Sequence, residues 1–465
     1  MALPQQQEQE QAKQPEKHVR VLSVYVISII ASLGGWLMGY DAGVISGTEL
    51  LLRKDFAMTP FMEEMAVSAS LFGGMIGAVV GSALSNKLGR KKTIILVACL
   101  FALGAALTAL SPNYALFLVF RVLVGVSIGI GSLVVPVYIS EIAPSKQRGK
   151  LVTFNRLALS LAIPAAYGIY LLLARLSVGW RTFFWIECIP AVVLTIGMVF
   201  LPESPRWLGS KGRWQAAEQQ LDRIKGTHPD HELKEIRHTL RLQGDHGSVG
   251  EFFVDGLRLA LLVGVGLGLF QQAVGSAAIS YYTPTIFKLA GFKSASLDVL
   301  ITGLVSIISL VACVLALFLL DRLGRRPLLL FSFSGMLLTL VVMGVVFLIG
   351  ATNAPYIVLI CLLVYILAYG VGIGPIFSLM CSEIFPTRLR GIGVGIAMLV
   401  NWGATLLVSL TFLTLIHGLG KPRTFWLYAA LALVGGIFTW FLVPETKGKS
   451  LEQIIYYWKH DQQWP

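Results

Sequence analysis

Charged side chains are scarce in this sequence. Only 13% of its 465 residues are Asp, Glu, Lys or Arg, and 55% are hydrophobic. A soluble globular domain carries roughly 25% charged residues, so most of this chain is not expected to face water. The formal net charge of +12 could indicate a nucleic-acid partner, but the basic residues gather in short loops between apolar runs, as in membrane proteins. We therefore expect a lipid bilayer around the chain and no nucleic acid.

Sequence signatures of metal sites, disulfides and enzymes are also missing. All five cysteines fall inside apolar runs without CxxC spacing, which indicates neither a disulfide framework nor a metal site. The sequence contains no P-loop, no HExxH and no nucleophile elbow, so it lacks the signatures of several common enzyme classes. We expect no metal, no cofactor and no enzymatic activity.

Twelve apolar runs are long enough to cross a bilayer, since a helix needs about 20 residues to span ~30 Å of hydrocarbon. Six runs precede a long polar segment at 202–256 and six follow it. We therefore predict an all-α membrane protein with two six-helix bundles. The predicted spans are 21–49, 63–85, 93–111, 114–139, 151–174, 181–201, 257–288, 297–320, 328–350, 355–382, 391–417 and 423–443.

The polar segments indicate how the chain is divided and oriented. We expect a disordered cytoplasmic tail at 1–20 without a cleavable signal, and short amphipathic helices in 202–256, where Trp214, Leu221 and Ile224 share one helical face. The bundles then cover 21–201 and 257–443, followed by a short tail at 444–465.

Lys and Arg are distributed unequally between the loops. Loops 86–92, 145–150 and 321–326 each hold at least three, whereas loops 112–113 and 351–354 hold none. Because basic loops stay in the cytoplasm, we predict that both termini and the 202–256 linker are cytoplasmic. The membrane would be a plasma membrane or a bacterial inner membrane.

Three motifs of the first half recur in the same order in the second half, which indicates a duplicated unit of several spans. The second and third pairs are offset by 242 residues (382 − 140 and 444 − 202), and the first by 235 (321 − 86). The pairs are NKLGRKK from Asn86 with DRLGRRP from Asp321, SEIAPSKQRG from Ser140 with SEIFPTRLRG from Ser382, and PES from Pro202 with PET from Pro444.

Three charged residues, Asp41, Arg121 and Glu187, lie inside predicted spans, where charge is costly and therefore usually functional. At ~1.5 Å of rise per residue they lie at similar depth, in the outer half. Two carboxylates and one guanidinium at one level can neutralise each other. The group could be a structural ion pair or a proton switch, because a guanidinium changes how readily a carboxylate takes up a proton.

Eight motifs in order resemble the sugar porter family of the major facilitator superfamily, from about Val21 to Glu452. The segment WRTFFWIECIPA from Trp180 is most similar to bacterial proton-coupled pentose and hexose symporters. The resemblance implies two six-helix bundles around a central cavity that work by alternating access. The motifs are GYDAGVISG from Gly39, NKLGRKK, PVYISEIAPSKQRG, PESPRWL, QQAVGSAAISYYTP from Gln271, DRLGRRP, SEIFPTRLRG and PETKGKS.

The resemblance also implies roles for particular residues. Asp41 would be the protonation site and Arg121 its partner, with Glu187 the third member. A further group would form inter-bundle salt bridges that close the inner side in the outward-facing state. A topology signal alone would explain its basic members but not its recurring carboxylates. The group contains Arg90, Glu141, Arg148, Glu203, Asp321, Arg325, Glu383, Arg390 and Glu445.

Amide and aromatic side chains suit a sugar pocket, because amides both donate and accept hydrogen bonds and rings cover C–H faces. The resemblance makes Gln271, Gln272 and Tyr281 sugar ligands or lid residues, and Asn401 and Trp402 a second ligand pair. Buried amides without partners are costly, so we expect a polar ligand or water beside the glutamines. We expect Tyr282 to serve in packing instead.

Four residues depart from the family's usual ligand pattern: Ile163, Ala277, Ser309 and Ser378. The pocket has lost or weakened polar ligands and one aromatic platform, so the substrate could be a sugar or a differently shaped polyol, cyclitol, disaccharide or organic solute. We predict proton-coupled symport. An uncoupled facilitator is the first alternative, against which Asp41 argues. A non-transporting sensor is the second, against which the short tail after Glu452 argues.

Overall fold

A computed structural model describes most of the chain. The described residues are 23–144, 147–174, 176, 178–225, 233–234, 236–237, 249–253, 257–291, 295–350, 355–386, 389–449 and 451–459. The tail predicted at 1–20 lies outside them, so the proposed domain limits remain predictions.

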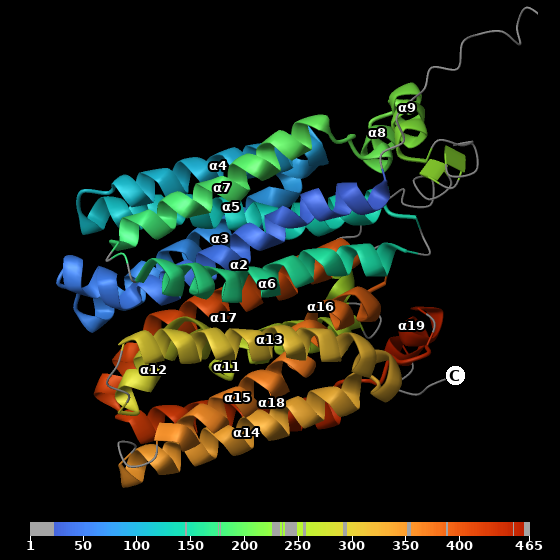
Figure 1. Ribbon diagram of the computed structural model, residues 1–465. Coiled ribbons are helices and arrows are strands. Elements are labelled where there is room, and N and C mark those ends of the chain that lie inside the picture. Colours follow the sequence, from blue (N-terminus) through green and yellow to red (C-terminus); the bar gives the residue numbers. More distant parts are fainter. Residues whose placement is uncertain are drawn as a thin grey trace, which may run out of the picture.

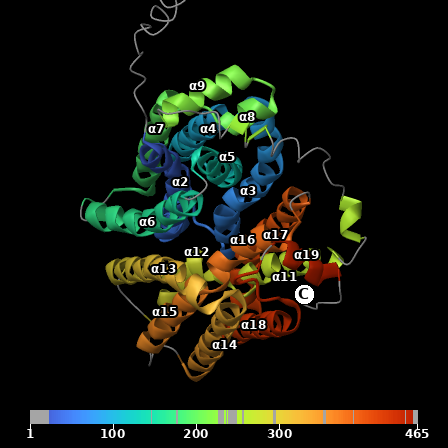
Figure 2. The same cartoon turned by 90° about the vertical axis from the view of Figure 1, so that its right-hand side faces the viewer.

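Two helical bundles lie side by side with their long helices running in the same general direction (Figures 1 and 2). Within the described ranges, twelve helices or helix pairs are long and apolar enough to cross a membrane, which confirms the predicted all-α architecture. The first bundle contains α2 Val24–Asp55, α3 Pro60–Leu88, α4 Arg90–Leu110, α5 Tyr114–Ile142, α6 Arg148–Ala174 and α7 Trp180–Phe200. The second contains α11 Leu257–Ala273, α12 Ser276–Leu289, α13 Ala295–Leu323, α14 Arg325–Ile349, α15 Pro355–Val371, α16 Ile373–Ile384, α17 Arg390–Gly418 and α18 Lys421–Leu442.

Short helices gather at one end of the bundles, which we call the linker end (Figure 1). They are α8 Pro205–Ser210, α9 Trp214–Lys225, the 3₁₀ helix η1 Val249–Phe253 and α19 Leu451–Lys459. Leu221 and Ile224 on α9 are buried, as the predicted amphipathic face requires. We call the opposite end, where α2 finishes and α3 begins, the far end.

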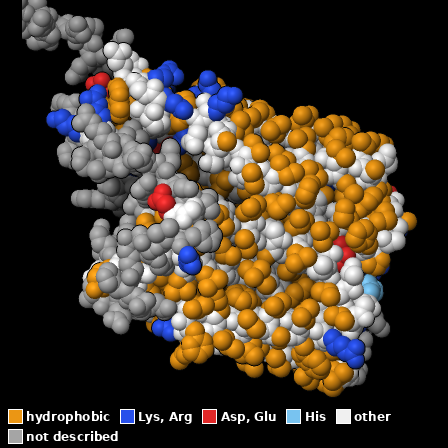
Figure 3. All heavy atoms as spheres, turned by 180° about the vertical axis from the view of Figure 1, so that it is seen from behind, with side chains coloured by type: hydrophobic (Ala, Val, Ile, Leu, Met, Phe, Trp, Pro, Cys, Tyr) orange, Lys and Arg blue, Asp and Glu red, His pale blue; other side chains and the backbone are white. Residues whose placement is uncertain are grey.

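Apolar side chains cover the outside of the bundles. Figure 3 shows hydrophobic side chains over the body of one face, with most of the visible Lys and Arg side chains toward the linker end. Exposed residues such as Phe331, Leu338 and Phe441 would be unfavourable in water but suit a hydrocarbon environment. The surface therefore agrees with a multi-pass membrane protein.

Two crossings of the second bundle are broken helices. The break between α15 and α16 falls at Gly372, close to Pro375, which lacks a backbone donor. The crossing predicted at 257–288 is found at Leu257–Leu289, and it too is broken, between α11 and α12. Gly275 has φ +89° there, a conformation that other residues adopt only with strain.

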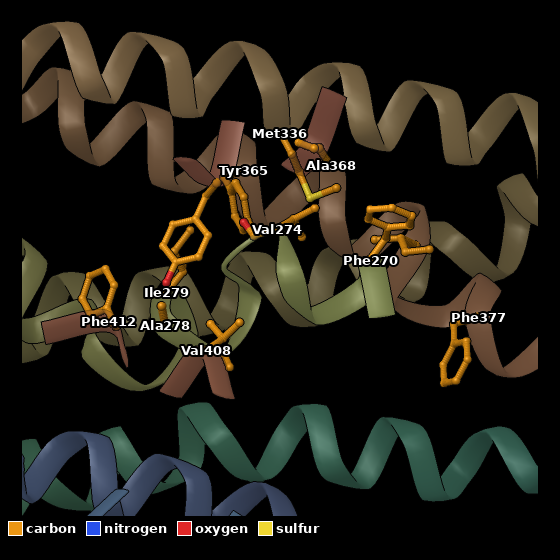
Figure 4. Close-up of a cluster of buried hydrophobic side chains, with 14 of the residues drawn as sticks. Phe270, Val274, Ala278, Ile279, Met336, Tyr365, Ala368, Phe377, Val408 and Phe412 are labelled. Atoms are coloured by element: carbon orange, nitrogen blue, oxygen red, sulfur yellow. The ribbon is translucent and has the colours of Figure 1, made fainter. Parts of the chain in front are cut away.

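The break before Gly275 is stabilised from the neighbouring helix. The hydroxyl of Tyr365 in α15 donates a hydrogen bond of 3.0 Å to the carbonyl of Val274. Figure 4 shows Tyr365 beside Val274 in an apolar cluster that includes Phe270 and Met336. The freed carbonyl is therefore satisfied inside protein, as a backbone break at membrane depth requires.

Close helix packing explains the glycines of α5. A Cβ atom at Gly125 would lie 2.0 Å from the carbonyl oxygen of Ser70 in α3, and one at Gly129 would lie 2.1 Å from that of Gly74. Only glycine allows the two backbones to approach this closely.

Candidate functional site

Asp41, Arg121 and Glu187 come together from three helices of the first bundle. Their exposed fractions are 3%, 0% and 0%. The Arg121 guanidinium binds both carboxylate oxygens of Asp41, with 3.1 Å between Nη2 and Oδ2. Its Nη2 also donates to the Ser70 hydroxyl at 3.0 Å, and its Cζ lies 5.5 Å from the centre of the Phe184 ring. The predicted pair therefore has a bidentate geometry that fixes the arginine.

Asp41, Arg121 and Glu187 together are called the coupling cluster below, and Glu187 is its unpaired member. Neither of its carboxylate oxygens has a hydrogen-bond partner in the described part of the chain, although both are buried. It interacts electrostatically with Asp41 and Arg121. A buried carboxylate is costly when it is both charged and without hydrogen bonds. The cluster thus contains two carboxylates and one guanidinium, and a single proton makes it formally neutral.

Tyr281 connects the coupling cluster with the second bundle. Its hydroxyl interacts electrostatically with Asp41 and Arg121, and also with Tyr369 in α15. Its backbone carbonyl accepts a hydrogen bond of 2.8 Å from the Ser46 hydroxyl of α2. A charge change at Asp41 therefore acts on a residue of α12, across the boundary between the bundles.

The predicted sugar ligands Gln271 and Asn401 bind each other. Nδ2 of Asn401 donates to Oε1 of Gln271 at 2.6 Å and to the Gly268 carbonyl at 2.9 Å. Nε2 of Gln271 donates to the Gly374 carbonyl at 2.7 Å, just after the helix break. Gln271 is therefore satisfied by protein groups, contrary to our expectation that its amide needs a ligand or water. These bonds tie α11 and α17 to the start of α16.

Gln272 and Tyr369 offer a more open polar surface. Gln272 is half-buried, and its Oε1 accepts a hydrogen bond of 2.7 Å from the Ser276 hydroxyl. The Tyr369 hydroxyl contacts the side chains of Gln272 and Ser276. Tyr369 was not predicted from the sequence, although an aromatic residue just before a stretch that contains Gly370, Gly372 and Pro375 was a usable signal.

Trp402 and Tyr282 contact other parts of the protein. The Trp402 ring lies against α3, where a Cβ atom at Gly74 would come within 2.5 Å of it. The Tyr282 hydroxyl donates to the Ser409 carbonyl at 3.0 Å, and its ring stacks on Phe412 with centres 5.3 Å apart. Tyr282 therefore packs as predicted, and Trp402 also helps to join the bundles.

The four residues that depart from the family's usual ligand pattern contribute few hydrogen bonds. Ala277 is buried, while Ile163 and Ser309 are half-buried. Ser378 is exposed, and its hydroxyl donates to the Pro375 carbonyl of its own helix at 3.1 Å. None of these side chains replaces the amide or aromatic group that the family resemblance leads one to expect.

At the linker end, two ion pairs have equivalent positions in the two halves. Arg90 binds both oxygens of Glu141, at 2.9 Å from Nε and 3.0 Å from Nη2. Arg325 binds Glu383, with 2.8 Å from Nη2 to Oε1. Each pair joins helices of one bundle. In this conformation these residues therefore do not form the inter-bundle bridges predicted for an outward-facing state.

Glu203 and Glu445 are helix caps in this structure. Oε1 of Glu203 accepts from the backbone N–H groups of Arg90 and Lys91, both at 3.0 Å, at the start of α4. Glu445 accepts from the backbone of Arg325 at 3.1 Å and of Arg326 at 3.0 Å, at the start of α14. Anions are stabilised at helix N-termini. The matching geometry shows that the sequence repeat is a structural repeat.

The remaining predicted gating residues are Arg148, Asp321 and Arg390. The Arg390 guanidinium donates to the Phe385 carbonyl through Nε and Nη2, at 3.4 and 3.5 Å. No ion pair of Arg390 occurs among the described residues. The side chains of Arg148 and Asp321 lie outside the described part of the structure.

Two carboxylates that were not predicted from the sequence link the bundles at the far end. Oε1 of Glu49 in α2 accepts from the Thr285 hydroxyl at 2.9 Å. Glu64 in α3 accepts from the backbone N–H and the hydroxyl of Thr414 in α17, at 2.7 and 2.6 Å. Glu49 and Glu64 are 3% and 0% exposed. Acidic residues at the ends of apolar runs could have indicated these contacts. However, acidic residues also occur at helix ends that only face water, so the sequence does not distinguish the two cases.

Comparison with known proteins extends these observations. The chain is 37% identical to the galactose-proton symporter of Escherichia coli K12, over 92% of this chain and 93% of that protein. It is 35% identical to the arabinose-proton symporter of Bacillus subtilis, over 94% of this chain and 95% of that protein.

The fold is similar to a solved inward-open conformation of the xylose transporter XylE from E. coli. The TM-score is 0.81 at 31% identity, covering 94% of this chain and 100% of that one. The sequence model of the sugar (and other) transporter family matches residues 27–458. With this match over nearly its whole length, the chain belongs to the sugar transporter family.

Proposed function

We propose that the protein is a secondary active transporter that moves a sugar or related polyol together with protons, and that it is not an enzyme. The observation that carries this proposal is the buried cluster in which Arg121 binds Asp41 while the unpaired carboxylate of Glu187 lies close enough to interact electrostatically with both. Charged groups at membrane depth are rare and usually mark ion or proton pathways. The names of the two proton symporters among its relatives support the same reading.

We place the linker end in the cytoplasm of a plasma or bacterial inner membrane. Two of the basic loops, 86–92 with four Lys and Arg residues and 321–326 with three, lead into α4 and α14 at that end. Basic loops are retained in the cytoplasm. Both termini and the linker would then be cytoplasmic, and the far end would face outward.

With this orientation, the conformation is inward-facing. Glu49 and Glu64 join the bundles at the outer end, whereas Glu141 and Glu383 pair within their own bundles at the inner end. The similarity to an inward-open transporter supports this assignment. Outward opening would break the outer contacts and let the inner charges, including Arg148, Asp321 and Arg390, exchange partners between bundles.

Proton exchange would act through the competition for Arg121. While Arg121 binds ionised Asp41, Glu187 carries the second site at which the cluster can hold a proton. Protonation of Asp41 weakens its hold on the guanidinium, which can then turn to Glu187. Tyr281 interacts with both members of the pair. The protonation state thereby influences α12 and the polar groups of Gln272, Asn401 and Trp402 that we assign to the substrate path.

Replacing Asp41 by asparagine tests this function, because asparagine resembles the protonated carboxyl and cannot release a proton. In proteoliposomes, Asp41→Asn should abolish uphill uptake driven by a pH gradient while largely preserving counterflow exchange. Asp55→Asn is the matched control, since Asp55 pairs with Arg181 at an exposed site and its loss should leave uphill uptake intact.

Two outcomes would contradict the proposal. If Asp41→Asn still accumulates substrate against a gradient, Asp41 is not the coupling residue and Glu187 becomes the next candidate. If the unmodified protein equilibrates substrate without any response to a pH gradient, it is an uncoupled facilitator.

A further inference from the structure

A second arginine, Arg156, lies inside a membrane-spanning helix. It follows the first residue of α6 by eight positions (156 − 148), which places it about 12 Å along the helix. Its side chain is exposed. It belongs to no ion pair among the described residues. A charge at this depth is costly without a partner or a water-filled cavity, so its environment needs an explanation.

The contacts of α6 show which way Arg156 faces. Asn155 and Leu159 lie against Gly35 and Gly39 of α2, and Leu161 and Leu172 are 49% and 75% exposed on the outer side. Arg156 lies on neither of these faces, because successive residues turn by about 100° around a helix.

Arg156 shares its face with Ile163 and Tyr167, at spacings of 7 and 11 residues. Tyr167 is next to Gly303 of α13, in the second bundle. Arg156 is therefore on the side of α6 that faces the second bundle, about two turns from Ile163 toward the linker end.

The charge of Arg156 reaches the polar surface described above. It acts electrostatically on the Tyr369 hydroxyl in α15. The same hydroxyl contacts Gln272 and Ser276, so the guanidinium, on the side of α6 that faces the second bundle, is directed toward the part of that bundle that holds the candidate substrate groups. The nearby positions Ile163 and Ala277 provide no hydrogen-bonding side chain. The guanidinium of Arg156 is therefore the strongest polar group on this side of the proposed substrate path.

We propose that Arg156 is an anion-binding subsite and that the transported sugar carries a carboxylate, as in a hexuronate or an aldonate. A planar guanidinium binds a carboxylate through two parallel hydrogen bonds, and one guanidinium matches a monoanion. The substrate carboxylate would sit toward the linker end while its hydroxyl groups meet Gln272 and Tyr369. This inference rests on the proposed transport function and specifies its substrate class.

Binding measurements on the purified full-length protein test the inference. Isothermal titration compares neutral hexoses and pentoses with the corresponding uronates and aldonates, for the unmodified protein and for Arg156→Gln, Arg156→Lys and Arg181→Gln. Arg181 lies at the far end in an exposed pair with Asp55, so Arg181→Gln removes the same charge elsewhere.

The unmodified protein should bind an acidic sugar about tenfold or more tightly than its neutral parent, as expected for a charge-assisted hydrogen bond. Arg156→Gln should remove that preference while changing the affinity for the neutral sugar by no more than about twofold. Arg156→Lys should keep part of the preference, and Arg181→Gln all of it. Unchanged binding of the neutral sugar shows that each variant is folded.

The failures of the two proposals are distinguishable. If neutral and acidic sugars bind equally well, or if Arg156→Gln keeps the preference, the anion subsite is refuted and the transport proposal stands. A role of Arg156 in gating alone would give this result. If no sugar of either class binds or is transported by the unmodified protein, both proposals are refuted.

Discussion

Replacing Thr414 by valine should shift the protein away from the conformation described here. Valine keeps the shape of threonine but lacks the hydroxyl that donates to Oε2 of Glu64 at 2.6 Å. The bond joins α3 to α17 across the bundle boundary, and Glu64 is fully buried there. When the far end opens, water can replace the lost donor. The substitution therefore destabilises the state with a closed far end more than the open one.

The size of the shift follows from the strength of one bond. A hydrogen bond to a charged group contributes roughly 1.5–3 kcal/mol net, which corresponds to a change of about 10-fold to 150-fold in the ratio of closed to open states. The backbone N–H of Thr414 still donates to Oε1 at 2.7 Å, so the contact is weakened and not abolished. If Glu64 is neutral, the contribution falls to about 1 kcal/mol and the shift to about fivefold.

Distances between spin labels at the far end measure this shift. In a variant without the five native cysteines, labels at Lys54→Cys and Leu419→Cys report the separation of the two bundles. Thr414→Val should enrich the longer distance. Thr411→Val is the matched control, because the Thr411 hydroxyl donates to the Leu407 carbonyl of its own helix at 2.8 Å. If both variants give the same distances, the bond to Glu64 does not hold the far end closed.

Two further predictions concern packing and the inner gate. Gly125→Ala places a Cβ 2.0 Å from the Ser70 carbonyl and should cost about 1–3 kcal/mol of stability. Melting in detergent should show this loss, but not for Gly403→Ala, which has open space around it. Alanine at Glu141 or Arg390 should favour the inward-facing state and slow net transport, with little change in substrate affinity. Normal transport in both variants would remove support for the gating role.

The pairing of Asp41 with Arg121 could be predicted from sequence because the depth of a residue in the membrane follows from its position along its span. Asp41 and Arg121 lie in different spans, but counting residues from the span ends places them at one level. Few arrangements bury two opposite charges at one level without pairing them. Their bidentate contact in the structure follows that expectation.

The partners of uncharged side chains were not predictable in this way. The amide of Gln271 could have faced a ligand, water or another helix, and only the fold places Asn401 and the Gly374 carbonyl beside it. The break at Gly275 was missed because an isolated glycine inside an apolar run fits close packing equally well. Arg156 was missed because it lies near a basic loop, where a charge suggests topology first.

The far-end contacts and the coupling cluster are linked through α2. This helix carries Asp41, which belongs to the coupling cluster. It also carries Ser46, which donates to the Tyr281 carbonyl, and Glu49, which accepts from the Thr285 hydroxyl. Since Tyr281 and Thr285 both belong to α12, a change in how α2 packs on α12 affects proton site and outer closure together. Opening the far end must break the contacts of Ser46 and Glu49, which lie one to two turns from Asp41. Proton exchange and outward opening would therefore be coupled by the geometry of one helix pair.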